Sequence, residues 1–220
     1  MSVLIVGGSS GLGLALAKEF ADSGEKVIVT GRTKPDVSFV EFKKLDLAQD
    51  DLPKIIKNFV KELPKINTLL FSAGFYQSGR VTDLTSQQID QMVQVAGTSL
   101  IYFMRELLAK QDSLDELITI TSTSQWTPRQ LEPIYNFAKA GIGQFSNAMA
   151  EDGRVGKVLV AGPSAMRTKF WDGVKRDDFD KMLDKEWVAG QIVKARTGDY
   201  KYKFIKLLRQ PARVEEADKR

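Results

Sequence analysis

One tyrosine and one lysine in the sequence are spaced for proton transfer. Tyr135 and Lys139 lie four residues apart, so on a helix both side chains project from the same face. A free tyrosine has a pKa of about 10, and a neighbouring ammonium group favours the phenolate and lowers that pKa. Ser122 follows a predicted strand shortly before Tyr135 and could hydrogen-bond a substrate oxygen. These three side chains predict acid–base chemistry on an oxygen atom.

The Tyr-x-x-x-Lys spacing alone is not specific, because it occurs twice in the chain. Tyr202 and Lys206 also fit it, but they straddle a predicted strand at 203–207. Residues four apart in a strand are far apart along the extended chain. Tyr135 and Lys139 instead fall on a predicted helix one short loop after Ser122. The alternative for this pair is a helix tyrosine beside a solvated lysine.

The composition excludes several other kinds of chemistry. The 220 residues contain no histidine and no cysteine, so a Ser-His-Asp triad, an imidazole base, a thiol nucleophile and a His or Cys metal site are all impossible. We therefore expect no bound metal. The net charge of +4 is spread among interspersed acidic residues, which does not favour nucleic-acid binding. The absence of cysteine suits a reducing compartment. With no apolar segment of membrane-spanning length, we expect a cytoplasmic protein without a membrane partner.

A glycine-rich segment follows the first predicted strand and leads directly into a helical pattern. Its spacing from Gly7 to Gly13 is Gly-x-x-x-Gly-x-Gly. Glycine permits positive φ angles and a close approach to phosphate, and a helix N-terminus offers free N–H groups to an anion. In this strand–turn–helix context we favour a dinucleotide site over a plain tight turn. The residues expected to contact the cofactor here are Gly7, Ser9, Ser10, Gly11, Leu12 and Gly13.

The residues at the end of the second predicted strand indicate which nicotinamide cofactor the protein uses. An acidic residue there would bind the ribose hydroxyls of NAD, but Val29-Thr30-Gly31-Arg32 contains none. The Arg32 guanidinium could hold a 2′-phosphate through two charge-assisted hydrogen bonds, and the Ser10 hydroxyl could assist. The alternative is a solvated arginine at a strand end. NADP(H) is therefore the favoured cofactor.

The elements that must position these residues alternate between strands and helices. Several strands are apolar on both faces, which is typical of a parallel sheet covered by helices. We expect an α/β fold, a single Rossmann domain over residues 1–208 with a doubly wound parallel sheet of about seven strands. Residues 164–185 should cross the ligand-binding edge, and residues 209–220 should form a loose polar tail. The predicted strands are Val3–Val6, Lys26–Thr30, Ser38–Leu45, Thr68–Phe71, Leu117–Thr121, Lys157–Val160 and Lys203–Leu207.

The glycine spacing, the Ser122-Tyr135-Lys139 set and a later proline loop together resemble the short-chain dehydrogenase/reductase family over nearly the whole chain. The resemblance implies that Gln94, where the family often has Asn, completes a proton relay through water. Val6, Ser72 and Ser164 also depart from the family pattern, which usually has Thr, Asn and Gly there. Members are commonly homodimers or homotetramers. The resemblance further assigns Asp46 and Leu47 to the adenine, Ala73 and Gly74 to the cofactor, and Pro163, Met166 and Thr168 to the nicotinamide carboxamide.

These features predict an NADP(H)-dependent oxidoreductase acting on a carbonyl or alcohol, with Tyr135 as general acid and base. Two alternatives remain: a catalytically weak NADP(H) sensor or scaffold, and a nucleotide-sugar epimerase or dehydratase, for which the chain leaves little room. The substrate is a small molecule that the sequence does not identify. Aromatic residues that could line an apolar pocket, or belong to the core or a subunit contact, are Phe75, Tyr76, Trp126, Phe170 and Trp171.

Overall fold

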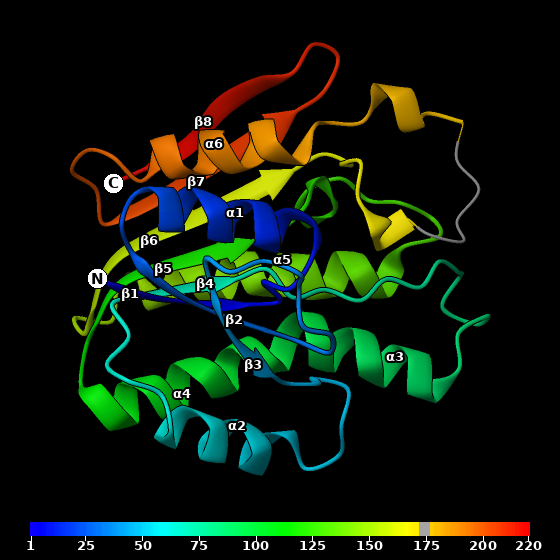
Figure 1. Cartoon of the computed structure of the whole chain (residues 1–220). Helices are drawn as coiled ribbons and strands as arrows, with labels where there is room; N and C mark the ends of the chain where they lie inside the picture. The colour runs from blue at the N-terminus through cyan, green and yellow to red at the C-terminus, as the bar shows by residue number, and fades with distance from the viewer. Residues whose placement is uncertain (172–176) are drawn as a thin grey trace.

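A computed structural model describes residues 1–171 and 177–220 of the chain, with one twisted sheet between two layers of helices (Figure 1). The strands are ordered β3-β2-β1-β4-β5-β6-β7-β8. This confirms the predicted α/β fold and doubly wound sheet. The strands are β1 (Ser2–Val6), β2 (Lys26–Gly31), β3 (Glu41–Lys44), β4 (Thr68–Phe71), β5 (Leu114–Ile120), β6 (Val155–Pro163), β7 (Tyr202–Leu208) and β8 (Arg213–Lys219). The α-helices are α1 (Gly11–Asp22), α2 (Leu52–Lys61), α3 (Ser86–Val93), α4 (Ser99–Gln111), α5 (Pro133–Met149) and α6 (Lys185–Ala195).

The first seven strands pair in parallel, and β8 closes the sheet as an antiparallel edge strand. The loose tail predicted for residues 209–220 is therefore wrong, because residues 213–219 pair with β7. All seven residues of β8 are exposed, so the segment carries no apolar alternation that could have revealed a strand. Tyr202 lies in β7, which confirms that the second Tyr-x-x-x-Lys pair falls on a strand.

Two apolar cores lie on opposite faces of the sheet, because successive strand residues point to opposite sides. In β1, Val3 and Ile5 join the core under α1 and α6. Leu4 and Val6 join the core beneath α2, α4 and α5. With both faces covered, the backbone of β1 is fixed, and so is the turn that follows it.

The strand order reverses between β1 and β4, where β2 and β3 lie to one side and β5 to β7 to the other. In doubly wound sheets, ligands bind outside the carboxyl ends of the strands, at the point where the strand order reverses. The predicted site residues follow β1 to β6 and so gather at this edge. Residues 164–185 also leave β6 at this edge, although 172–176 lie outside the described residues.

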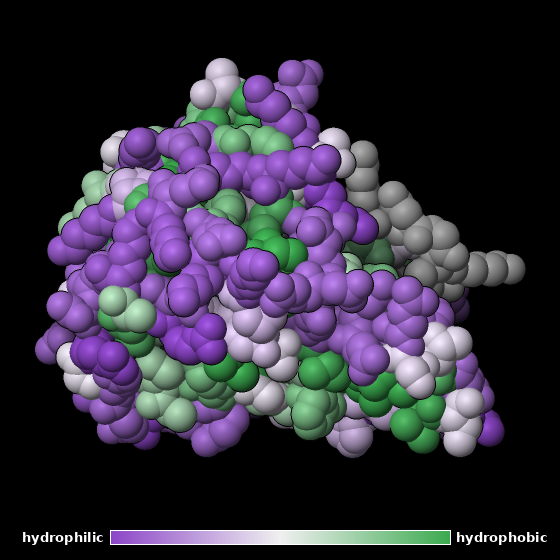
Figure 2. Space-filling view, turned by 90° about the horizontal axis from the view of Figure 1, so that it is seen from below, coloured by the Kyte–Doolittle hydropathy of each residue, from purple (hydrophilic) through white to green (hydrophobic). Residues whose placement is uncertain are grey.

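The surface on the side of α2, α3 and α4 is mostly hydrophilic, with apolar side chains gathered in smaller patches (Figure 2). Among the large apolar side chains, Ile101 on α4 is 44% exposed and Phe137 on α5 is 65% exposed. No helix in the described part of the chain is both long and apolar enough to cross a bilayer.

Candidate active site

The turn between β1 and α1 holds its shape through close backbone contacts. Gly7 has a φ of +82°, and a Cβ built on it would lie 2.7 Å from Ala73. A Cβ on Gly13 would lie 2.2 Å from the Gly7 carbonyl oxygen, so α1 can approach the turn only with glycine at that position. Ser10 is the N-cap of α1, but its side chain makes no capping bond, and the first turn has no acidic residue. The helix N-terminus is therefore suited to an anion.

The end of β2 places Arg32 next to this turn. Gly31 packs against Ser9, and a Cβ on Gly31 would lie 2.0 Å from the Ser9 hydroxyl oxygen. The close packing of the turn therefore requires glycine at residue 31. This reason is separate from the cofactor preference inferred from the sequence. Arg32 is exposed and forms no hydrogen bond or ion pair with any residue that the structure describes. Its guanidinium is free to bind a ligand.

Ser122, Tyr135 and Lys139 come together where β5 ends and α5 begins. Pro133 starts α5 at its first turn, where a proline ring fits best. Asn136, next to Tyr135, donates to the carbonyl oxygens of Ser124 and Thr127 at 2.7 Å each and ties the loop after β5 to the helix. The buried Lys139 amine donates to the Ile120 carbonyl oxygen at 3.0 Å and lies 5.7 Å from the centre of the Tyr135 ring.

The pKa values in this cluster differ from the simple expectation. Burial lowers the pKa of the Lys139 amine to about 8. The pKa of Tyr135 is raised above its usual value, first by burial and then by the Glu132 carboxylate, while a hydrogen bond with Ser122 lowers it. Against the prediction that Lys139 lowers it, the pKa of Tyr135 is raised overall, because the penalty of burial exceeds the lowering effects of Ser122 and Arg129.

Gln94 does not join these residues. Its side-chain nitrogen donates to the carbonyl oxygens of Leu47 and Gln49, at 2.9 Å each. The amide therefore braces the loop after β3, where Asp46 accepts a bond from the Ala48 N–H at 3.0 Å. Residues 94–98 form a single π-helical turn between α3 and α4, a feature often found at functional sites. Neither bond connects the Gln94 side chain to Tyr135 or Lys139, and the relay through water expected of this residue stays a prediction.

The loops after β4 and β6 converge on the same edge of the sheet. Gly74 is exposed, and a Cβ on it would lie 3.8 Å from the Lys139 amine. Thr168 faces Gly11 at the start of α1. Pro163 is the last residue of β6, and the Met166 carbonyl oxygen accepts from the Trp171 indole at 3.0 Å. The segments predicted to contact the cofactor thus surround one region.

Three aromatic rings cluster beside the predicted proton donor, Tyr135. The Tyr76 ring centre lies 5.3 Å from that of Tyr135, 5.7 Å from Phe170 and 5.5 Å from Trp171. Of the five aromatic residues considered for a pocket, Tyr76 and Phe170 therefore contact Tyr135, and Trp171 packs on both of them. Trp126 does not, because it packs against Phe204 of β7 at 5.5 Å.

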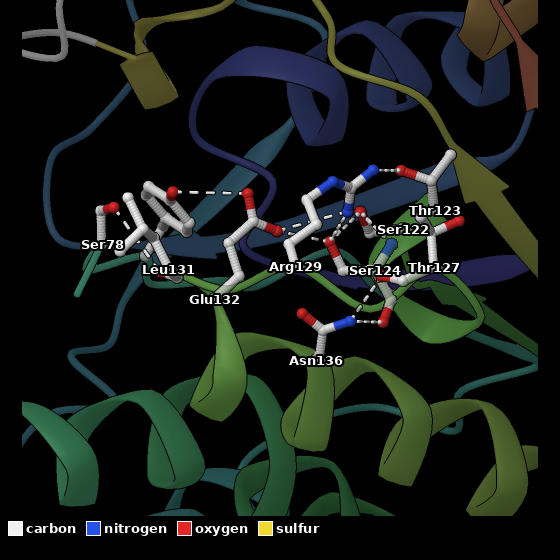
Figure 3. Close-up of polar contacts among 10 residues, drawn as sticks. Ser78, Ser122, Thr123, Ser124, Thr127, Arg129, Leu131, Glu132 and Asn136 are labelled. Carbon is white, nitrogen blue, oxygen red and sulfur yellow. Dashed lines mark hydrogen bonds and ion pairs between the residues drawn. The ribbon is translucent and has the colours of Figure 1, made fainter. Parts of the chain in front are cut away.

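A polar network not foreseen from the sequence lies beside Tyr135 (Figure 3). Glu132 accepts from the Ser124 hydroxyl at 2.9 Å and pairs with Arg129 at 3.3 Å. Arg129 also donates to the Thr123 hydroxyl at 2.8 Å. The other Glu132 oxygen accepts from the Tyr76 hydroxyl at 3.5 Å. The only sequence signal was the presence of an arginine and an acid in the loop between Ser122 and Tyr135.

Comparison with known proteins is consistent with this geometry. The sequence model of the short chain dehydrogenase family matches residues 1–178. The chain belongs to this family. As a member it is an oxidoreductase, acts on small molecules and uses a nicotinamide cofactor.

Relatives of this short-chain dehydrogenase are distant in sequence but similar over most of its length. An uncharacterized oxidoreductase of Staphylococcus epidermidis is 24% identical over 210 residues, covering 88% of this chain and 90% of the relative. The closed form of a serine dehydrogenase complexed with NADP+ has a TM-score of 0.81 at 22% identity, covering 93% and 94% of the two chains. A Sphingobium yanoikuyae short-chain dehydrogenase in complex with NADPH has a TM-score of 0.75 at 21% identity, covering 88% and 83%. These structures share the fold.

The close turn of this dehydrogenase predicts a large effect of Gly13→Ala. The new methyl group would overlap the Gly7 carbonyl oxygen, and relieving such a clash costs about 1–3 kcal/mol. Gly141→Ala on α5 is the matched control, because a Cβ there meets nothing within 4 Å and should stabilise the helix by about 0.5–1 kcal/mol. Urea unfolding of both variants measures the difference. Equal stability of the two variants would contradict the packing described for the turn.

Proposed function

We propose that this protein is an NADP(H)-dependent oxidoreductase that transfers hydride between the nicotinamide and a carbonyl or alcohol substrate. The observation that carries the proposal is the buried Lys139 amine beside Tyr135 and Ser122, at the sheet edge that also holds the glycine turn. When bound, the nicotinamide supplies or accepts the hydride. The residues of the chain supply binding, orientation and the proton.

The shape of the edge fits a dinucleotide. The uncapped N-terminus of α1 and the glycine turn would take the pyrophosphate through backbone N–H groups. Asp46 and Leu47 would flank the adenine. The loops carrying Ala73, Gly74, Pro163, Met166 and Thr168 would hold the nicotinamide end, with Lys139 donating to its ribose.

Two observations favour NADP(H) over NAD(H). Arg32 follows β2 with no partner among the described residues, and the strand end carries no acid that would repel a 2′-phosphate. The fold neighbours crystallised with NADP+ and NADPH support the same preference.

In carbonyl reduction, Ser122 and Tyr135 would hydrogen-bond the carbonyl oxygen and Tyr135 would donate its proton to the forming alkoxide. A tyrosine whose pKa is raised stays protonated at neutral pH and is ready to act as an acid. The positive charge of Lys139 would hold the ribose and stabilise the phenolate that remains. Alcohol oxidation is the reverse sequence.

The aromatic cluster of Tyr76, Phe170 and Trp171 points to a substrate with an apolar group next to its carbonyl. A substrate that reaches Tyr135 must stack on these rings or displace them, because Tyr76 and Phe170 contact Tyr135 directly and Trp171 packs on both. Aromatic aldehydes, quinones and hydrophobic diketones meet this requirement.

Absorbance assays of NADPH oxidation with such carbonyls test the proposal. Tyr135→Phe keeps the ring packing but removes the proton, so kcat should fall by about 100-fold or more. Arg32→Ala should weaken NADPH binding by about ten-fold or more and leave NADH binding nearly unchanged, because only NADPH carries the phosphate. Turnover undiminished in Tyr135→Phe would contradict the assignment. Tight NADPH binding without turnover would favour the sensor or scaffold alternative.

The lowered pKa of Lys139 predicts a pH dependence of NADPH affinity. Below a pH of about 8 the amine is protonated and attracts the anionic cofactor, whereas above it the amine becomes neutral. The Kd for NADPH should therefore rise as the pH increases through about 8. Lys139→Met should bind more weakly but show no such change. Fluorescence titrations at several pH values measure both proteins, and a parallel pH profile in the variant would contradict the role of Lys139.

We also infer that the protein forms a homodimer or homotetramer. The exposed apolar side chains that could form such a contact include Phe137 on α5, 65% exposed, and Ile101 on α4, 44% exposed. Contiguous patches of such side chains mark protein contacts. Phe137→Glu should shift the protein to monomers in sedimentation velocity runs. The same sedimentation coefficient for the variant and the wild type would rule out a contact through Phe137.

A further inference from the structure

The Tyr76 ring stands directly against the proposed proton donor. Its centre lies 5.3 Å from that of Tyr135 with the two planes at 88°, whereas the Phe170 ring centre lies 6.2 Å from that of Tyr135. Tyr76 also contacts Phe170 at 5.7 Å and Trp171 at 5.5 Å. Rings at these separations touch, so no further ring fits between Tyr76 and Tyr135.

The loop after β4 that carries Tyr76 is fastened to the residues just before α5. The Gly79 N–H donates to the Leu131 carbonyl oxygen at 2.9 Å. The Ser78 hydroxyl reaches the same oxygen at 3.5 Å, and Figure 3 shows Ser78 beside Leu131. The Tyr76 hydroxyl lies 3.5 Å from Glu132 Oε1, which is long for a hydrogen bond. The backbone bond is therefore the main anchor of the loop.

The other side of the aromatic cluster lies near the Lys139 amine. A Cβ built on Gly74 would lie 3.8 Å from Lys139 Nζ and 3.8 Å from the Phe170 ring. In the proposed function, Lys139 holds the nicotinamide ribose, so this is the cofactor side of the site. A substrate that reaches Tyr135 is therefore confined between the cofactor and the rings of Tyr76 and Phe170.

The two rings that contact Tyr135 differ in how firmly they are held. Phe170 is 36% exposed and lies in a single 3-10 turn, Lys169–Trp171. Tyr76 is half-buried, and its loop is bonded to Leu131. A substrate can therefore displace Phe170 by rotating one exposed side chain, which frees the space of one ring. Displacing Tyr76 would also require the loop to move.

We propose that Tyr76 is a specificity-determining residue, which limits the group on the substrate carbonyl to about the size of a single flat ring. The proposal rests on the oxidoreductase function proposed above and narrows its substrate class. A single ring can take the place of Phe170, whereas a fused system of several rings also needs the place of Tyr76. The limit comes from the bulk of the Tyr76 ring and not from its hydroxyl.

Variants that shrink Tyr76 in steps test the proposal. Tyr76→Phe keeps the ring, Tyr76→Leu keeps part of its bulk and Tyr76→Ala removes it. Each is assayed with NADPH and with benzaldehyde, 2-naphthaldehyde and 9-anthraldehyde, which carry increasing numbers of fused rings. The readout is kcat/KM for 9-anthraldehyde divided by kcat/KM for benzaldehyde. Comparing this quotient with that of the wild type cancels the intrinsic reactivity of the aldehydes.

The quotient should increase by about ten-fold or more in Tyr76→Ala, because an apolar pocket discriminates between groups of different size by such factors. Tyr76→Leu should give a smaller increase, and Tyr76→Phe should stay close to the wild type. Tyr102→Ala is the matched control, since Tyr102 is a half-buried tyrosine on α4 whose ring faces Arg105. It should leave the quotient unchanged.

Binding of the product alcohols gives a readout that needs no turnover. Isothermal titration calorimetry with NADPH present measures the Kd of 9-anthracenemethanol and that of benzyl alcohol. The first Kd divided by the second should fall by about ten-fold or more in Tyr76→Ala. The affinity for NADPH itself should equal that of the wild type, which shows that the variant is folded and that its cofactor site is intact.

The outcomes that overturn the proposal differ from those that overturn the function. If Tyr135→Phe is inactive while Tyr76→Ala and Tyr76→Leu keep the wild-type quotients, Tyr76 does not set the limit and the function stands. An increase in Phe170→Ala without one in Tyr76→Ala would also refute the proposal, as would equal increases in Tyr76→Phe and Tyr76→Ala.

Wild-type protein that reduces none of these carbonyls would overturn the proposed function. The two Kd values would then decide the role of Tyr76 by themselves. An unchanged quotient of Kd values in Tyr76→Ala, or no binding of either alcohol to any of the proteins, would refute the size limit as well.

Discussion

The burial of the Lys139 amine determines much of the electrostatics of this site. Lys139 is 3% exposed, and among the residues that the structure describes its amine has one hydrogen-bond acceptor, the Ile120 carbonyl oxygen. An ammonium group so poorly solvated is costly, which is why the pKa falls to about 8. Groups that accept hydrogen bonds, such as ribose hydroxyls, would reduce this cost on binding. The poorly solvated amine therefore favours a ligand that brings such acceptors to it.

The sheet keeps this amine in position. β5 supplies the acceptor at its carboxyl end, and α5 supplies both Tyr135 and Lys139 from one face. Asn136 joins the loop to the helix, and the apolar cores on both sides of the sheet fix the strands beneath. The glycine turn reaches the same edge because β1 lies beside β4, where the strand order reverses. Loops that are distant in the sequence thus lie next to one another at this edge of the sheet.

The sequence predicted the parts of the fold in which local patterns and tertiary structure agree. Thr68–Phe71 was located without error because the strand is apolar on both faces and fully buried. Ser38–Leu45 was predicted too long, since only Glu41–Lys44 pairs with β2. β8 was missed because its residues are all exposed and only pairing with β7 makes them a strand.

The candidate site was predicted less completely, because residue types do not determine side-chain direction. Nothing in the pattern around Gln94 indicates that its amide faces the Leu47 and Gln49 carbonyls. The contact of Glu132 with Tyr76 depends on two loops that are 56 residues apart. Burial of Tyr135 was also invisible in the sequence, and it reverses the expected direction of the pKa shift.

Isotope transfer in a single turnover tests the central claim most directly. The enzyme would be mixed with an aromatic aldehyde and NADPH carrying deuterium at both positions of nicotinamide C4, and the alcohol product would be analysed by mass spectrometry. The account predicts one deuterium on the carbinol carbon with the wild type and almost no labelled alcohol with Tyr135→Phe. Unlabelled alcohol from the wild type, or equal labelling by the variant, would contradict it.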